Sequence, residues 1–569
     1  MVALPGGFSM SFTYTASAAD WARIAPILVL AAVALLVLMV DLLLPQPAKN
    51  QKSSTTYLVL PILSLLGLAG AIIATIILFI FGDHLPAFYM MISSDQGSLY
   101  AFIIILSASA LGILLSPSYL KRMNLMHQGE YYALMLLATI GMMILAAATS
   151  FLTVFLGLEM LSLALYILSG FVLRRSSSQE SGMKYFLLSS FASAFLLYGI
   201  AMTYGATGNT SFIGIHTFLF NNFPTTRSVN PTIVGQLPTF LLIGMGLLIV
   251  GFAFKVSAIP FQAWTPDVYE GAPAPVTAFM SVGTKAAALI AFARVFDVML
   301  PLVKPDWEVV VLVITILTII GGNIMALVQS NVKRMLAYSS IANAGYLLIG
   351  VVAGGAIGLS AILFYLLCYT FMNLGAFGVV SVLERADNAG VHLSEIRGLW
   401  NRQPVLAGLL AFFMLALAGF PPMAGFAAKY YIFYAALQSG HPELMILGVL
   451  ASILGMYYYL RVIAATFMEK ETVLATTPAI PAPVAGKRTS ITSSEGGIGT
   501  ATAVAVKSTP KTTVEVETTV EQNLANAGWT TWIALGLAAF GTLAMGTLLP
   551  FWLVDLALQA ARMMLLLAR

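Results

Sequence analysis

The sequence predicts an all-α membrane protein with about fourteen transmembrane helices, and three observations support this. Of its 569 residues, 59% are hydrophobic and only 9% are charged, with a mean hydropathy of +0.92, whereas charged residues make up about a quarter of a soluble domain. Apolar runs of about 20 residues, the length needed to cross the hydrocarbon core of a bilayer, recur along the chain. These runs lack the period-two alternation of barrel strands, so we expect helices, which satisfy their own backbone groups.

The predicted spans fall into a first group before a polar stretch and a second group after it. The first group comprises residues 24–44, 57–81, 99–115, 131–149, 151–171 and 185–204. The second group comprises residues 239–259, 275–298, 309–328, 335–352, 359–382, 405–434, 444–468 and 529–553. The first span has no basic leader and no small-residue cleavage pattern, so we expect it to stay in the protein as a helix and not to be removed as a signal peptide.

Positive charge marks one side of the predicted bundle. The basic residues of the loops after odd-numbered helices are Lys49, Lys52, Lys121, Arg122, Arg174, Arg175, Lys333, Arg334, Arg385, Arg397 and Arg402. Loops after even-numbered helices hold little beyond Arg227 and Lys304. By the positive-inside rule the odd-numbered loops face the cytoplasm, and an even helix count puts both termini on the other side. Because the net charge of +4 is spread over these loops, it indicates topology in a lipid bilayer and no nucleic-acid partner.

The sequence offers no set of ligands for a cofactor. Its one cysteine, Cys368, lies inside an apolar run and can form no disulfide within the chain. No cluster of cysteines and histidines has the spacing of a zinc, iron–sulfur or haem site. We therefore expect no cofactor and no metal in this chain.

Two predicted spans contain helix breakers at corresponding places, residues 254–260 in the seventh helix and 419–425 in the twelfth. Transporters built from internal repeats place such breaks in matching positions of the two repeats, and the ion path lies there. Because five helices, an odd number, separate the breaks, the two five-helix repeats should be inverted relative to each other. The predicted divisions are helices 1–3 in residues 1–130, the first repeat in 131–300, the second repeat in 301–470, a polar loop in 471–526, and the last helix with its tail in 527–569.

The loop 471–526 is rich in Thr, Ser, Ala, Val and Pro, and it has too few large apolar residues to bury a core. We expect a disordered cytoplasmic loop there, although a small Val- and Thr-rich β-element around residues 512–520 is the alternative. The end of the chain, 553–569, is amphipathic and should form a helix near the membrane interface.

Few ionisable residues lie at bilayer depth, and they are Glu159, Lys184, Lys255, Lys285 and Lys429. A charge at the centre of a membrane helix costs at least about 2.5–3.5 kcal/mol, so each must face a partner or water. Glu159 should be protonated, hydrated or paired with a lysine of a neighbouring helix. Lys184 could equally well extend its ammonium group to the headgroups. The buried cations are lysines, which can lose a proton when desolvated as arginines cannot, and this predicts proton transfer.

The stretch from residue 255 to 277, KVSAIPFQAWTPDVYEGAPAPVT, followed by Lys285, resembles the antiporter-like membrane subunits of respiratory complex I, or NADH-quinone oxidoreductase. The resemblance is closest to the subunit N branch of that family. Residues 183–188, 332–346 and 419–422 support it, and the likeness covers about residues 20–470 and the final span.

The resemblance implies roles for all five ionisable residues. Glu159 is then the fifth-helix carboxylate that pairs with a lysine, Lys184 the lysine of the sixth helix, and Lys255 the central lysine of the seventh. Lys285 matches the eighth-helix lysine and Lys429 the twelfth-helix lysine near the exit half-channel.

The resemblance further implies a proton-translocating subunit of a translocase in the bacterial inner membrane. Its partners are the other membrane subunits, and NADH, FMN, iron–sulfur clusters and quinone are carried by partner subunits. The chain departs from the family at Gln262, where many relatives have histidine, and in the length of loop 471–526.

Two other functions stay open at this point. A subunit of a multisubunit sodium/proton antiporter would share the broken helices and the lysines. A purely structural membrane subunit would use its polar residues only to hold helices together.

Overall fold

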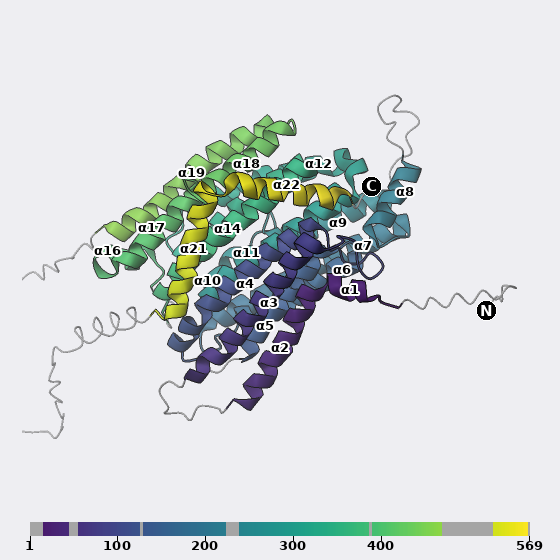
Figure 1. The fold of residues 1–569 in the computed structure, drawn as a ribbon. Helices are drawn as coiled ribbons and strands as arrows, with labels where there is room; N and C mark the ends of the chain where they lie inside the picture. The colour runs from purple at the N-terminus through teal and green to yellow at the C-terminus, as the bar shows by residue number, and fades with distance from the viewer. Residues whose placement is uncertain are drawn as a thin grey trace, which may run out of the picture.

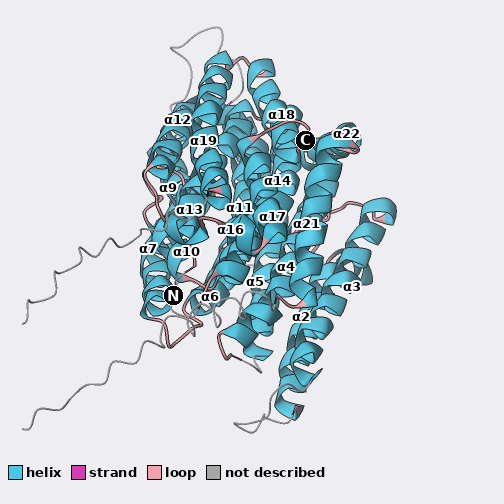
Figure 2. Cartoon of the chain, turned by 90° about the vertical axis from the view of Figure 1, so that its left-hand side faces the viewer, coloured by secondary structure: helices cyan, strands magenta, loops and turns pink. Residues whose placement is uncertain are grey.

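The computed structural model describes residues 15–44, 55–125, 129–223, 238–385, 390–468 and 527–566. Within these ranges the chain forms helices joined by short loops, with isolated β-bridges and no strand, so the predicted all-α class is confirmed. Thirteen of the described helices are long and apolar enough to cross a membrane. The twelfth predicted span, which the structure divides into two shorter helices, completes the predicted set of about fourteen crossings. Most helices run side by side (Figures 1 and 2).

The helices follow the predicted order. The first part contains α1 (Ala18–Arg23), α2 (Ala25–Leu43), α3 (Val59–Phe81) and α4 (Gln96–Arg122). The next contains α5 (Gly129–Ala147), α6 (Phe151–Ser169), α7 (Ser176–Thr207), the short α8 (Phe212–Asn222), α9 (Thr239–Val256), α10 (Trp264–Gly271) and α11 (Ala274–Ala293), which continues as the π-helical turn η3 (Arg294–Met299).

The rest of the chain repeats this pattern. It contains α12 (Lys304–Leu327), α13 (Val332–Ala353), α14 (Gly355–Leu383), the short α15 (Leu393–Ile396) and α16 (Leu399–Arg402), α17 (Pro404–Ala418), α18 (Ala424–Gln438), α19 (Pro442–Phe467), α21 (Trp529–Thr547) and α22 (Pro550–Leu566). Loop 471–526, for which disorder was the expectation, lies outside the described residues. The division of the chain at residues 130, 300 and 470 stays a prediction.

Several predicted boundaries are wrong: α4 continues to Arg122, beyond the predicted 115, and α21 ends at Thr547, before the predicted 553. The largest difference is at the start of the sixth span. The sixth span was expected to begin at residue 185, but α7 already begins at Ser176 and contains Lys184 in its third turn. The residues before 185 are polar, which hid them from a search for apolar runs. They are helical nonetheless, and Glu180 and Lys184 form an i,i+4 ion pair of the kind that stabilises a helix end.

Both predicted helix breaks are present. Helix α9 ends at Val256 and Ser257 has a φ of +66°, while α17 ends at Ala418 and Gly419 has a φ of +89°. Each break also contains an X–Pro cis peptide bond. A residue in the left-handed region cannot continue an α-helix, and glycine is the residue best suited to it.

A small structural feature recurs in the two five-helix groups and supports their inverted relation. A β-bridge joins Ser150, before α6, to Ser211, after α7. The matching bridge joins Asn331, before α13, to His392, after α14. The first bridge lies after an even-numbered crossing and the second after an odd-numbered one, so they lie at opposite ends of the bundle. We call the end with Lys333, Arg334 and the other odd-numbered loops the basic face, and the other end the opposite face.

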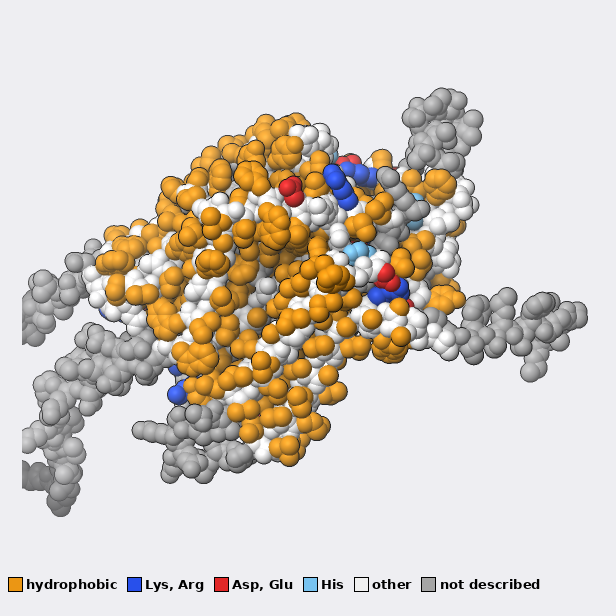
Figure 3. Space-filling model, viewed as in Figure 1, with side chains coloured by type: hydrophobic (Ala, Val, Ile, Leu, Met, Phe, Trp, Pro, Cys, Tyr) orange, Lys and Arg blue, Asp and Glu red, His pale blue; other side chains and the backbone are white. Residues whose placement is uncertain are grey.

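The outer surface is apolar, as a lipid-facing bundle requires. Hydrophobic side chains cover most of the side seen in Figure 3, and its few charged side chains lie mainly towards the ends of the helices. By contrast, every residue of α11 is buried, which makes that helix the centre of the molecule.

The last helix, α22, turns away from the other helices and lies across the bundle (Figure 1). It packs against α4 and α14 through Leu553, Ala557, Ala560, Ala561 and Met564. Phe551 and Trp552 at its start are exposed. An amphipathic helix was expected over 553–569, and the structure contains it as far as Leu566.

Substitution of Gly157 by alanine should destabilise the bundle. A Cβ atom on Gly157 of α6 would lie 2.6 Å from the backbone nitrogen of Leu145 in α5, and a main chain cannot move aside as a side chain can. We expect a loss of about 1–3 kcal/mol, measured as a lower thermal unfolding midpoint of the purified protein. The control is Gly246→Ala in α9, where nothing lies within 4 Å of the added atom. Equal midpoints for the two variants would contradict the prediction.

Candidate functional site

Lys255 lies in the last turn of α9, directly before the first break, and only 2% of the residue is exposed. Its ammonium group donates hydrogen bonds to the hydroxyl of Ser162 in α6, at 2.6 Å, and to that of Ser189 in α7, at 2.7 Å. The rings of Tyr166 and Tyr185 lie about it, with centroids 6.0 and 5.8 Å away. The ammonium group is therefore held by neutral oxygens and aromatic faces.

The expected carboxylate, Glu159, lies in the same region without touching Lys255. It precedes Ser162 by three residues on α6, so it lies about one helical turn from a hydroxyl that binds the lysine. Among the described residues no ion pair joins Glu159 to a lysine, and its buried Oε1 atom has no hydrogen-bond partner. The structure thus brings the two predicted residues near each other but not into direct contact.

Lys285 lies at the middle of α11 and is 1% exposed. Its ammonium group donates to both the carbonyl oxygen of Ser340, at 2.6 Å, and the hydroxyl of Ser340 in α13. Ser340 follows the second bridge residue, Asn331, by nine residues, and Glu159 follows the first bridge residue, Ser150, by nine as well. A serine therefore takes the place in the second repeat that a glutamate takes in the first.

Lys429 lies in α18, just after the second break, and is 8% exposed. Its ammonium group donates to the carbonyl oxygens of Leu417 and Ala418, at 3.2 and 3.0 Å. The last carbonyls of a helix have no partner within that helix, so the break in the backbone supplies the oxygens that hold this lysine. The ring of Tyr346 faces the ammonium group at 5.4 Å.

Buried hydroxyl groups lead from Lys285 towards Lys429. Ser339 directly precedes Ser340 in α13. The hydroxyl of Ser339 is hydrogen-bonded to the hydroxyl of Tyr459 in α19. The ring centroids of Tyr459 and Tyr458 are 4.5 Å apart.

The second half of this route ends at Lys429. The Tyr458 hydroxyl donates to the side-chain oxygen of Asn323 in α12, at 3.2 Å. The amide nitrogen of Asn323 donates to the hydroxyl of Tyr346, at 3.3 Å, and Tyr346 is the ring that faces Lys429. The sequence reading missed these residues because none is charged, although an asparagine inside an apolar run was a usable signal.

A run of aromatic residues leads away from Lys255 and begins at Tyr185. Tyr185 stacks on Trp264 at 4.7 Å, and Trp264 contacts Tyr269 edge to face at 6.2 Å. The hydroxyls of Tyr166, Tyr185 and Tyr269 are buried, and none of them has a hydrogen-bond partner among the described residues. Buried polar atoms of this kind are normally satisfied by internal water.

Lys184 lies apart from these lysines, near the basic face. Its side chain is 40% exposed and forms ion pairs with Glu180 and with Asp267 of α10, both at 2.7 Å. Asp267 also pairs with Arg334 at the start of α13, at 2.8 Å. Of the four predicted lysines, Lys184 is therefore the one that is not buried, and Glu159 is also partly exposed.

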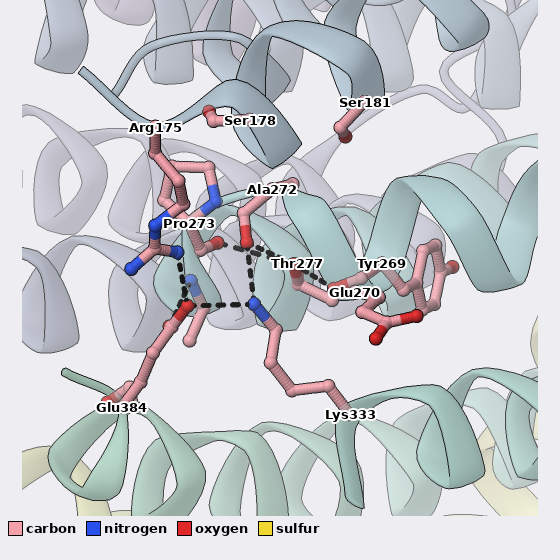
Figure 4. Close-up of polar contacts among 12 residues, drawn as sticks. Arg175, Ser178, Ser181, Tyr269, Glu270, Ala272, Pro273, Thr277, Lys333 and Glu384 are labelled. Carbon is pink, nitrogen blue, oxygen red and sulfur yellow. Dashed lines mark hydrogen bonds and ion pairs between the residues drawn. The ribbon is translucent and has the colours of Figure 1, made fainter. Parts of the chain in front are cut away.

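A buried charge cluster that the sequence reading missed ties the two repeats together at the basic face (Figure 4). Glu384, just beyond α14, accepts hydrogen bonds from Arg175 at 2.6 Å and from Lys333 at 3.0 Å. Its other oxygen accepts the backbone N–H of Ala274, at the start of α11, while Lys333 also donates to the carbonyl oxygen of Ala272. Burial would raise the pKa of Glu384, but the charges of Lys333 and Arg175 outweigh it and lower that pKa below its ordinary value.

In the part of the chain that the structure describes, no group of three or more His, Cys, Asp or Glu side chains could hold a metal ion. What the site offers is a line of amines and hydroxyls, running from Lys255 through Lys285 to Lys429. Such groups can bind and release protons or order water molecules.

The family model described as NADH:quinone oxidoreductase/Mrp antiporter matches residues 148–455, which include both breaks and Lys184, Lys255, Lys285 and Lys429. NADH-quinone oxidoreductase subunit N of Trichlorobacter lovleyi is 43% identical over 446 residues, which cover 78% of this chain and 87% of that protein. Subunit N 1 of Herpetosiphon aurantiacus is 44% identical over 411 residues, which cover 72% of this chain and 82% of the relative.

Solved structures agree with this relationship. A chain of respiratory complex I from Thermus thermophilus, solved with bound aureothin, is 29% identical and has a TM-score of 0.64, with 92% of this chain and 98% of that chain covered. A chain of the Mrp complex from Dietzia sp. shares the fold at 20% identity, with a TM-score of 0.70 over 96% of this chain and 97% of that one. On the identity and coverage of its relatives, the chain belongs to the family of NADH-quinone oxidoreductase subunit N.

Proposed function

We propose that this chain moves protons across the bacterial inner membrane as the subunit N of an NADH-quinone oxidoreductase. The observation that carries the proposal is the line of Lys255, Lys285 and Lys429, all buried and all held by neutral oxygens. Glu159 is the acid beside the first of these lysines. Lys184, whose side chain reaches solvent, belongs to the entry side at the basic face.

The choice of residue supports proton transfer over a static role. Removal from water penalises the charged form of an amine, so a buried lysine can exist as a neutral base, whereas arginine stays charged. A hydroxyl can accept one proton while it donates another. The Ser339–Tyr459 contact and the Tyr458–Asn323–Tyr346 bonds give such groups between Lys285 and Lys429.

The direction follows from topology. By the positive-inside rule the basic face is cytoplasmic, so α1 and α22 lie on the outer side. Moving a charge against the membrane potential costs about 2.3 kcal/mol per 100 mV, so the energy must come from elsewhere. We infer that it comes from partner subunits of the complex, which would carry NADH, FMN, the iron–sulfur clusters and quinone.

The multisubunit sodium/proton antiporter is the second candidate, favoured by the fold shared with the Mrp complex chain. Its likeness is at 20% identity, against 43% for the Trichlorobacter lovleyi subunit N. Deletion of the gene distinguishes the two functions. Loss of NADH-driven proton pumping is expected, whereas lost sodium tolerance with intact NADH oxidation would favour the antiporter.

Replacement of Lys285 by methionine should lower the number of protons translocated per NADH oxidised, because the amine that exchanges the proton is gone. Lys285→Arg should fail as well, since it retains a charge that cannot be released. Both are measured in membrane vesicles with normal amounts of assembled complex. Lys121→Met, at an exposed lysine of the basic face, is the control. Undiminished pumping by both Lys285 variants would refute the proposal.

Removal of a single hydroxyl from the route should slow pumping with little effect on folding. Tyr458→Phe keeps the ring and loses the bond to Asn323, which costs about 0.5–1.5 kcal/mol of stability. We expect proton transfer between Lys285 and Lys429 to slow by on the order of 100-fold, observed as a lower pumping rate. Tyr431→Phe removes a hydroxyl bonded to Ser360, away from the route, and should pump normally. Equal rates for the two variants would exclude Tyr458 from the path.

A further inference from the structure

A second group of ionisable side chains lies on the opposite face, outward from the buried lysines. Asp297 follows Lys285 by twelve residues and lies in η3, the π-helical end of the eighth transmembrane helix. His441 follows Lys429 by twelve residues and precedes α19. Together with Lys304, Glu308 and Glu443, these residues form what we call the outward cluster.

Asp297 is the buried member of the outward cluster. It is 7% exposed, and its Oδ2 atom is buried with no hydrogen-bond partner among the described residues. The Oδ1 atom of Asp297 and the Lys304 ammonium group both lie close to Gly354. A Cβ atom added to Gly354 would lie 2.7 Å from Oδ1 of Asp297 and 3.4 Å from Nζ of Lys304. Since a buried carboxylate is costly without a proton or a partner, an acid with one oxygen unpaired is suited to take up a proton.

A chain of contacts leads to solvent from Lys304, which lies with Asp297 at the turn at Gly354. Lys304 lies 3.3 Å from Glu308 on the next turn of α12. Glu308 lies 3.0 Å from Nε2 of His441, whose Nδ1 lies 2.9 Å from Glu443. The Glu308 side chain is 22% exposed and that of Glu443 53% exposed, so the chain runs from the interior to the surface.

The arrangement of His441 suits proton transfer. Each ring nitrogen faces a carboxylate, so the imidazole can take a proton at Nε2 from Glu308 and release one at Nδ1 to Glu443. A purely structural role would be the alternative, but ion pairs at a surface contribute little stability. Such a role also leaves the unpaired Oδ2 atom of Asp297 without an explanation. Arg294, one turn before Asp297, is bound to Asp95 at 2.8 Å and takes no part.

We infer that the outward cluster is the proton-release site of this subunit. A proton leaving the lysine line protonates the Asp297 carboxylate. When that O–H bond breaks, the Lys304 ammonium group gives one of its own protons to the Glu308 carboxylate and takes the Asp297 proton in its place. Glu308 then passes a proton to Nε2 of His441, which releases one from Nδ1 to Glu443 and water. One proton enters and one leaves, and no electrons are exchanged. The inference rests on the proposed pumping function, whose outer side is the opposite face.

The test uses the assembled complex in inside-out vesicles, where the opposite face lines the lumen. Asp297→Asn keeps the shape of the side chain but cannot release a proton, and it should lower the pumping rate by on the order of 10- to 100-fold. Asp297→Glu should restore part of the rate. Asp83→Asn, which alters a carboxylate paired with Arg23 on the same face, is the matched control and should pump normally.

Chemical rescue separates proton release from a structural role. His441→Ala should pump slowly, and imidazole, whose neutral form crosses the membrane and reaches the lumen, should restore the rate. If Asp297→Asn and His441→Ala both pump normally while Lys285→Met does not, the outward cluster is not the release site and the pumping function stands. If His441→Ala is slow and lumenal imidazole has no effect, the release role is likewise refuted. Normal pumping by Lys285→Met would instead overturn the pumping function itself.

Discussion

The cost of keeping a charge inside a hydrocarbon layer governs this structure. Each buried ammonium group must find oxygen atoms within the protein, and each does so differently. Lys255 uses serine hydroxyls, Lys285 uses a serine side chain and its carbonyl, and Lys429 uses the free carbonyls at the end of α17. Neutral oxygens hold the charged amine without fixing it permanently, as a buried ion pair would. The second break belongs to the same solution, since the carbonyls at the end of α17 have no partner within that helix.

A different rule applies at the basic face, where charges are paired directly. Glu384 is bound by Arg175 and Lys333, which come from helices far apart in the sequence, and removing one partner from such a buried group leaves an uncompensated charge. This cluster fixes the start of α11 relative to α13 and α14, and so it fixes the helix that carries Lys285. Static pairing at the membrane surface and loosely held amines in the interior are thus combined in one bundle.

Much of this could be read from the sequence, and the reasons for the failures are physical. Long apolar runs and prolines within them are local signals, so the spans and both breaks were predictable. The start of α7 was not, because polar residues such as Glu180 hide a helix that extends beyond the apolar run. Partners were harder still: the sequence leaves Glu159 protonated, hydrated or paired with a lysine, and the choice among these depends on the side-chain arrangement between helices. Tyr458 and Asn323 come together only through tertiary packing, which no local pattern encodes.

The crosswise helix α22 limits how the molecule can move. It contacts α4 from the N-terminal helices, η3 from the first repeat and α14 from the second. Axial shear of any one of these relative to the others would pull it out of register with α22 and expose the small residues Ala557 and Ala560. The crosswise helix therefore opposes sliding of α4, α14 and the end of α11 past one another.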